Sequence, residues 1–332
     1  MHIQGDPVSL NRRQFAALAA IAACAFAGAA LAQSWPDKTI RFVVPYTPGG
    51  GTDAVTRQLA DAITRDTKWA FLVDNKPGAA GNIGMDQVAK AAPDGYTLGM
   101  GQTANMAINP AALSHMPFDA SKDFVPVALV AAVPTVLVVR ADSPWKSLAD
   151  LVKAGKAKDG GLNQALAGTG TVGHLSGVML ASKAGFKTVD VPYKGAAPAV
   201  TDLLAGQTDF MFATPQAIMG MLQGNKLRAL AVTSAKRVNA LPNVPTVAEQ
   251  GYPGFVAVDW KVVIAPAGTP ADVVTRLNAA VAKAMTQPAV VARLADEAST
   301  AMHGNPQEAA KFVHAEQAKW ATLIKQANIH LD

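Results

Sequence analysis

The chain has 332 residues, of which 50% are hydrophobic and 16% are charged, and its formal net charge is +5. A chain of this length can bury a large core and is typical of two domains. Lys and Arg form no run and no basic stripe with interleaved aromatic residues, so nucleic acid is not an expected partner. The mild excess of positive charge would favour anionic ligands.

The first 32 residues have the pattern of a cleaved export signal. Arg12 and Arg13 precede an uncharged run from Phe15 to Ala32, which ends in a small-x-small cleavage pattern. The run is nearly long enough for a membrane anchor, but Ala dominates it and strongly inserting residues are few. We expect cleavage after Ala32 and a periplasmic location. The arginine pair also resembles a twin-arginine signal, and the choice of export route stays open.

Cys24 is the only cysteine of the sequence and lies inside this signal. Its surroundings weakly resemble a lipoprotein processing site, but lipid attachment there would leave too short a hydrophobic segment before the cut. Removal of the signal takes away Asp6, Arg12 and Arg13, so the net charge changes from +5 to +4. The mature chain would then have no cysteine, and neither disulfides nor thiol catalysis are expected.

From residue 39 onward, short β-branched segments alternate with helical patterns, which is typical of βαβ units. In the first unit Val55, Leu59 and Ile63 recur every four residues as one helix face. Each expected strand leads through a short loop, most of them rich in glycine, into a helix. The strands cover residues 40–45, 71–74, 162–167, 189–191 and 209–212, and the loops cover 46–53, 76–84, 168–174, 193–198 and 213–216.

The C-terminal part is expected to be helical. Residues 269–272, Thr-Pro-Ala-Asp, would cap one helix, and residues 305–308, Asn-Pro-Gln-Glu, would cap a second. No low-complexity linker divides the chain, so two lobes must be joined by strand-like crossings, for which 135–142 and 256–264 are candidates. The expected division is a signal at 1–32, a first lobe at 35–135 plus 259–332, and a second lobe at 136–258.

The loops that open the helices are candidates for anion binding. The first turn of a helix has unpaired N–H groups and a partial positive charge, and several such turns around one cleft form an anion site. In open α/β sheets this cleft lies beyond the carboxyl ends of the strands. Threonines 47, 52, 169, 171 and 214 would add hydroxyl donors. A small carboxylate is therefore the expected ligand.

Several loop residues have two interpretations. Asp53 fits a helix cap better than a ligand contact, because its charge would repel an anion. Lys194 could pair with a ligand carboxylate or be a solvated turn residue. Tyr46 and Tyr193 could line the cleft or pack beneath their loops. Trp260, at the second proposed crossing, is a candidate for the pocket wall.

A dinucleotide-binding enzyme is one alternative. Gly168, Gly170 and Gly173 match G-x-G-x-x-G, and Asp190 lies 22 residues beyond the first glycine. The strand before this loop is polar for a buried first strand, and it lies in the middle of the chain. We therefore favour the binding protein.

An exported hydrolase or transferase is a second alternative. The six histidines show no metal-ligand spacing, and no G-x-S-x-G motif is present. His174 and Ser176 could suggest acyl transfer, although a loop-packing histidine fits better. Neither a metal, nor a cofactor, nor enzymatic activity is expected.

Motifs along the whole mature chain resemble the Bug family of periplasmic binding proteins, the TctC-like proteins that serve tripartite tricarboxylate transporters. Together these motifs are specific, although each alone is weak. They are residues 35–41, 44–50, 75–78, 93–98, 191–195, 227–233, 245–246 and 265–270. The usual two-glycine loop has three glycines here, at 49–51, which leaves open which amides would face a ligand.

The resemblance implies an α/β fold of the two-lobed periplasmic binding protein (flytrap) type, each lobe a mostly parallel sheet flanked by helices. It implies a monomer that captures an amino acid, a di- or tricarboxylate or an aromatic acid and delivers it to membrane subunits of the transporter. The loops that match the family's motifs give Thr47, Pro48, Gly50, Thr52, Thr169, Thr171, Gly173, His174, Lys194 and Gly195 as ligand-binding candidates. Neighbouring positions add Tyr46, Gly51, Asp53, Gly81, Tyr193, Thr214 and Trp260.

Overall fold

The computed structural model describes residues 35–193, 195–296 and 298–331. The described residues from Thr39 onward form one compact unit, to which the following description is confined. The expected export signal and Lys194 lie outside the described residues. Over the part of the chain that is described, every helix is too short or too polar to cross a membrane.

The first sheet has six strands in the order β11-β4-β10-β3-β1-β2. β1 pairs in parallel with β2 and β3, whereas β10 runs antiparallel to β3 and β4, and β11 antiparallel to β4. The strands are β1 (Ile40–Val44), β2 (Phe71–Asn75), β3 (Thr97–Gln102), β4 (Phe124–Pro134), β10 (Val258–Pro266) and β11 (Thr300–Ala301).

The second sheet has five strands in the order β7-β6-β8-β5-β9. β6 pairs in parallel with β7 and β8, whereas β5 runs antiparallel to β8 and β9. The strands are β5 (Val136–Arg140), β6 (Leu162–Leu166), β7 (Thr188–Pro192), β8 (Phe210–Ala213) and β9 (Leu227–Val232).

Both sheets are mixed, which corrects the expectation of mostly parallel sheets. β4 leaves the first sheet and continues through Thr135 into β5, and β10 brings the chain back beside β4. Neighbouring strands through which the chain leaves and returns must run antiparallel. All five expected strand-loop-helix units are present, so the α/β architecture of two sheets flanked by helices is confirmed.

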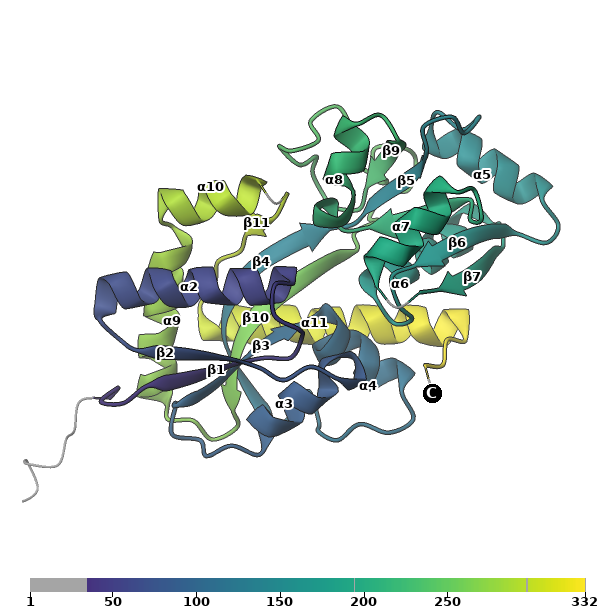
Figure 1. Cartoon of the computed structure of the whole chain (residues 1–332). Coiled ribbons are helices and arrows are strands. Elements are labelled where there is room, and N and C mark those ends of the chain that lie inside the picture. The colour runs from purple at the N-terminus through teal and green to yellow at the C-terminus, as the bar shows by residue number, and fades with distance from the viewer. Residues whose placement is uncertain (1–34, 194, 297, 332) are drawn as a thin grey trace, which may run out of the picture. The chain divides into compact units, whose positions relative to one another are not determined.

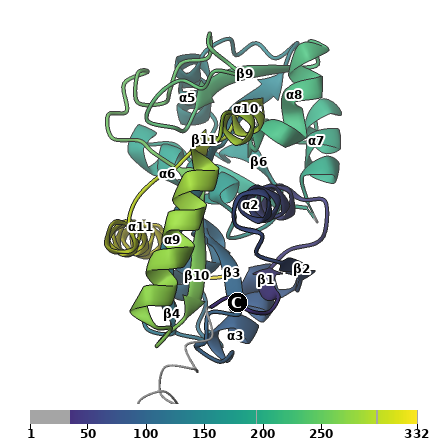
Figure 2. The same ribbon diagram turned by 90° about the vertical axis from the view of Figure 1, so that its left-hand side faces the viewer.

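The helices of the first sheet lie on both of its faces, with α2 and α11 on opposite sides (Figures 1 and 2). Because both faces are covered, successive side chains of β10 must point alternately to one face and to the other. The Trp260 indole packs toward α11, and Lys261 faces a cavity at the start of α2. The elements are α2 (Gly51–Thr67), η1 (Ala79–Gly81), α3 (Asn82–Ala89), η2 (Ala104–Ile108), α4 (Asn109–Ala112), α9 (Ala271–Met285), α10 (Pro288–Asp296) and α11 (Pro306–Ala327).

Helices also cover both faces of the second sheet, and alternate side chains of β5 pack against different helices. Val136 and Val138 pack with residues of α7 and α8, whereas Leu137 and Val139 pack with residues of α5 and α6. The four valine and leucine side chains are fully buried. The helices are α5 (Leu148–Ala157), α6 (Val172–Ala184), α7 (Ala196–Leu204) and α8 (Pro215–Gln223).

One of the two predicted helix caps is present. Asn305 Oδ1 accepts from the Glu308 N–H at 2.8 Å, and Glu308 Oε2 accepts from the Asn305 N–H at 2.9 Å. The prediction for Thr269 is wrong, because α9 begins after Pro270 and the Thr269 hydroxyl donates to the Pro266 carbonyl at 2.8 Å. A hydroxyl two positions before the first helical residue can bond to its own turn instead.

Candidate functional site

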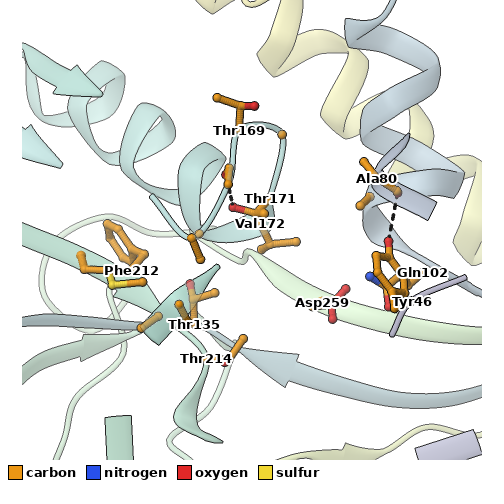
Figure 3. Close-up of a pocket in the computed structure, with 18 residues that line it drawn as sticks. Tyr46, Ala80, Gln102, Thr135, Thr169, Thr171, Val172, Phe212, Thr214 and Asp259 are labelled. Atoms are coloured by element: carbon orange, nitrogen blue, oxygen red, sulfur yellow. Dashed lines mark hydrogen bonds between the residues drawn. The ribbon is translucent and has the colours of Figure 1, made fainter. Parts of the chain in front are cut away.

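A cavity of about 360 Å³ lies between residues of the two sheets (Figure 3). Its walls come mainly from loops at strand ends, where the sequence predicted the ligand. From the first sheet and its loops come Tyr46, Ala80, Gln102, Ala104 and Asp259, and from the second come Ala167–Gly173, Ala196, Met211–Thr214 and, at the crossing, Thr135.

Tyr46 forms one wall of the cavity, held from below by η1. Its hydroxyl donates to the Ala80 carbonyl at 3.1 Å and accepts from Asn105 Nδ2 at 3.4 Å. A Cβ on Gly81 would lie 2.9 Å from the tyrosine oxygen, and the φ of 93° at this position also favours glycine. Burial, and then the charge of Asp259, raise the pKa of Tyr46, so the phenol stays neutral. Gly81 thus supports the wall rather than forming it.

The opposite wall is the glycine-rich loop before α6. Thr171 caps this helix, because its hydroxyl accepts from the His174 N–H at 3.2 Å and donates to the Gly168 carbonyl at 2.9 Å. The N–H groups of Val172 and Gly173, in the first turn, have no acceptor within the helix. Both residues line the cavity. The loop therefore presents backbone donors to the cavity, and the exposed Thr169 adds a hydroxyl.

His174 holds this loop from behind and does not line the cavity. Its side chain is 5% exposed, its Nδ1 accepts from the Gly170 N–H at 3.1 Å, and its Nε2 lies 2.9 Å from Asp190 Oδ2. Since Nδ1 accepts, Nε2 carries the proton and donates to the carboxylate. The expectation that His174 contacts the ligand is therefore corrected in favour of loop packing.

The same contacts weaken the two enzyme alternatives. Asp190, the acid that a dinucleotide ribose would need, is hydrogen-bonded to His174. The Ser176 hydroxyl, a conceivable nucleophile, is fully buried and donates to the Val172 carbonyl at 2.7 Å. Within the described ranges, no group of three His, Cys, Asp or Glu side chains could hold a metal ion.

The loops before α7 and α8 complete the wall of the second sheet. Ala196, at the start of α7, and Thr214, which precedes Pro215 of α8, line the cavity. Tyr193 packs beneath its loop, where its hydroxyl donates to Asp202 Oδ2 at 2.7 Å. Burial and the neighbouring Asp202 raise the pKa of Tyr193 to about 12. The Gly195 N–H donates to the Ala167 carbonyl at 3.1 Å, so this glycine also has a supporting role.

The first glycine loop is divided between solvent and a second, smaller cavity. Thr47, Pro48 and Gly50 are exposed and do not line the larger cavity, whereas Gly51 and Thr52 line a cavity of about 140 Å³. Which amides face the ligand could not be decided from the three glycines, because it depends on how the loop lies against the second sheet.

Asp53 holds the first glycine loop in place. It accepts from the Gly49 N–H at 2.9 Å, from Arg57 Nε at 3.1 Å and from Asn75 Nδ2 at 2.9 Å. Burial opposes ionisation, but these hydrogen bonds and the Arg57 charge outweigh it and lower the pKa of Asp53. The carboxylate therefore stabilises the start of α2 from inside its first turn. The prediction that Asp53 is the N-cap is wrong, because Gly50 is the N-cap of this helix.

Trp260 lies away from both cavities, which corrects its assignment to the pocket wall. It is fully buried, its indole Nε1 donates to Glu316 Oε2 at 2.9 Å, and its ring packs edge-to-face on Phe312. Its strand neighbours Asp259 and Lys261 point to the opposite face and line the cavities instead. Sequence reasoning missed both, although alternation along β10 could have identified them.

Gln102 was also missed. It is the last residue of β3, it is 8% exposed, and it lines the larger cavity. Its Oε1 accepts from the Thr52 hydroxyl at 2.6 Å, which leaves its amide nitrogen as a donor. A polar residue that ends a buried strand was the available signal.

This chain is similar to known proteins over most of its length. A family model described as the tripartite tricarboxylate transporter family receptor matches residues 55–329. Protein BugT of Bordetella pertussis is 35% identical over 312 residues, which cover 94% of this chain and 96% of BugT. The similarity therefore spans both sheets and all the loops around the larger cavity that lie after Tyr46.

Two solved structures are similar over nearly the same range. R. palustris Rpa4515 with adipate has a TM-score of 0.80 at 35% identity, covering 89% of this chain and 99% of that chain. MatC from Rhodopseudomonas palustris with bound malate has a TM-score of 0.74 at 32% identity, covering 87% and 100%. These likenesses confirm the expected fold class of periplasmic binding proteins.

Proposed function

Because the chain belongs to the tripartite tricarboxylate transporter receptor family, we propose that it captures a small carboxylate in the 360 Å³ cavity and delivers it to a membrane transporter of the tripartite type. The proposed site consists of donors from both walls. They are the amides at the starts of α6, α7 and α8, the hydroxyls of Thr169 and Thr214, and the side-chain amide of Gln102. The Tyr46 hydroxyl already donates to Ala80, so its ring serves as a wall.

The observation that supports this proposal best is the convergence of helix starts on one cavity. No Lys or Arg is among the described residues that line it, so an anion there would depend on backbone donors. Each helix start stabilises an anion by about 0.3–2 kcal/mol. Three such starts, added to hydroxyl and amide hydrogen bonds of about 0.5–1.5 kcal/mol each, approach the roughly 8 kcal/mol of a micromolar complex.

The position of the cavity between two walls suggests why only the ligand-bound protein would be recognised by the transporter. A carboxylate that bonds to both walls stabilises the arrangement in which the walls are close together. The transporter would recognise that arrangement, and the empty protein would be released. In this proposal the signal at residues 1–32 directs the chain to the periplasm, and residues 136–258 and the remainder of the mature chain form the two lobes.

The first experiment is calorimetric titration of the purified protein with a panel of aliphatic and aromatic carboxylates, including adipate and malate. Each acid is paired with the ester in which every carboxylate is methylated, which keeps the carbon chain but carries no charge. We expect at least one acid to bind with micromolar affinity, its ester to bind far more weakly, and the recovered acid to be chemically unchanged. Binding of acid and ester with equal affinity, or conversion of the acid, would contradict the proposal.

A further inference from the structure

The smaller cavity, of about 140 Å³, adjoins the larger one. Thr214 and Asp259 line both cavities, so a ligand in the larger one could extend past them into the smaller. Gly51 and Thr52 at the start of α2, and Gln216 in the first turn of α8, form part of its wall. The start of α2 therefore faces this space, together with the start of α8, which also borders the larger cavity.

Lys261 gives the smaller cavity a buried cation. The lysine is 2% exposed, and its Nζ lies 3.1 Å from Asp259 Oδ2. An ammonium has three donors, and Asp259 occupies one of them. Burial of this charge in a sheet costs free energy, and a single carboxylate only partly compensates it. Further acceptors close to Lys261 would therefore be bound strongly.

Ser299 adds a hydroxyl that has no partner. The residue is 5% exposed, it lines the smaller cavity, and its Oγ makes no hydrogen bond within the described structure. Buried hydroxyls are rarely left without a partner, because the lost hydration is not replaced. An acceptor bound in the cavity would supply the missing bond.

We propose that the smaller cavity is a subsite for the second carboxylate of a dicarboxylate, with Lys261 and Ser299 as its specificity-determining donors. This inference rests on the proposed function, since it places the first carboxylate in the larger cavity. Asp259 opposes the second carboxylate by charge, and it limits the affinity that Lys261 can give.

The test compares adipate with hexanoate, which has the same carbon chain but only one carboxylate. For the wild-type protein we expect adipate to bind at least tenfold more tightly. Lys261→Met removes a charged donor, so adipate binding should weaken about tenfold to a hundredfold. Hexanoate binding should change less than twofold, because hexanoate has no second carboxylate to bond to the lysine.

Two variants cover the possibility that Lys261→Met is poorly folded, since it leaves Asp259 without its cation. The pair Asp259→Asn with Lys261→Met has no lone buried charge, and it should also lose the preference for adipate. Asp259→Asn alone should strengthen adipate binding several-fold, because it removes the opposing charge and leaves Lys261 uncompensated. The opposite result, weaker adipate binding in Asp259→Asn, would overturn the proposal.

Ser299→Ala tests the second donor, and Thr208→Val is its matched control. Thr208 is also 5% exposed and its hydroxyl also has no described partner, but it lines neither cavity. We expect Ser299→Ala to weaken adipate binding about threefold to tenfold and Thr208→Val to leave it unchanged.

The two proposals fail in different ways. If the wild type binds neither acid nor any other carboxylate, the proposed function fails. If it binds adipate and hexanoate equally, and Lys261→Met changes neither affinity, the larger cavity binds carboxylates and only the subsite is refuted.

Discussion

Thr233 and Thr135 exchange hydrogen bonds at the point where the chain crosses between the two sheets. The Thr135 N–H donates to Thr233 Oγ1 at 2.9 Å, and the Thr233 N–H donates to the Thr135 carbonyl at 3.0 Å. The Ala257 N–H donates to the Thr233 carbonyl at 3.0 Å, just before β10. The two threonines are almost completely buried. These bonds join the end of β9 to both crossing segments.

Thr233→Val should destabilise the protein, because it leaves the buried Thr135 N–H without an acceptor. The expected loss is about 1–3 kcal/mol in the free energy of unfolding, measured by urea denaturation. Thr233→Ser is the matched control. It keeps the hydroxyl, so its free energy of unfolding should decrease less. Equal losses in the two variants would assign the effect to packing of the methyl group and contradict the hydrogen-bond account.

Gly173→Ala should destabilise the protein, because the added Cβ would overlap the Phe212 carbonyl oxygen of β8. Overpacking of this kind costs about 1–3 kcal/mol, and here it would also displace the start of α6. Gly220 lies inside α8, and a Cβ there meets nothing within 4 Å. Gly220→Ala should therefore stabilise the protein by up to about 1 kcal/mol. The free energy of unfolding of both glycine variants is measured by urea denaturation. A stable Gly173→Ala variant with normal affinity would refute this packing argument.

Thr169 and Thr171 should respond differently to substitution, although both are threonines of one loop. Thr169→Ala removes an exposed hydroxyl and should weaken carboxylate binding about threefold to tenfold, without change in melting temperature. Thr171→Val removes the cap of α6 and should cost about 1 kcal/mol of stability. Thr171→Ser should restore the cap. A melting temperature that is unchanged in Thr171→Val would contradict the capping role.

Asp53 makes stability depend on pH in the acid range. Its pKa in the folded protein lies below the ordinary value of 3.8, so the unfolded chain takes up a proton at higher pH than the folded one. The contribution of Asp53 is therefore complete above about pH 5 and is lost as the pH falls through the folded pKa. Between pH 5 and pH 2 the free energy of unfolding, plotted against pH, should fall more steeply for the wild type than for Asp53→Asn. Parallel curves would show that this carboxylate is not coupled to folding.

The sequence predicted the five strand-loop-helix units because local signals mark them. Glycine and proline interrupt the chain between a β-branched run and a four-residue repeat, as at residues 46–53 before Val55. These signals depend on neighbouring residues only, and packing did not override them. The direction of β4 and β10 could not be predicted in this way, because it depends on which sheet the chain enters after each crossing.

The candidate site was predictable in its backbone but not in its side chains. The starts of α6, α7 and α8 follow from the loops, and they line the cavity as expected. Whether a loop side chain faces the cavity or packs behind it depends on distant partners, such as Asp190 for His174 and Asp202 for Tyr193. Trp260 was predicted from its position at the proposed crossing, whereas the pleat of β10 turns its neighbours Asp259 and Lys261 toward the cavities.

The most direct test of the account is the amide resonances of Val172 and Gly173, at the start of α6, during titration with adipate. Together with the side-chain amide of Gln102, on the opposite wall, they should shift downfield with the same apparent affinity, and the methyl ester should not reproduce the shifts. Shifts confined to one wall, or absent at the helix start while adipate binds, would contradict a carboxylate held by backbone donors between the two sheets.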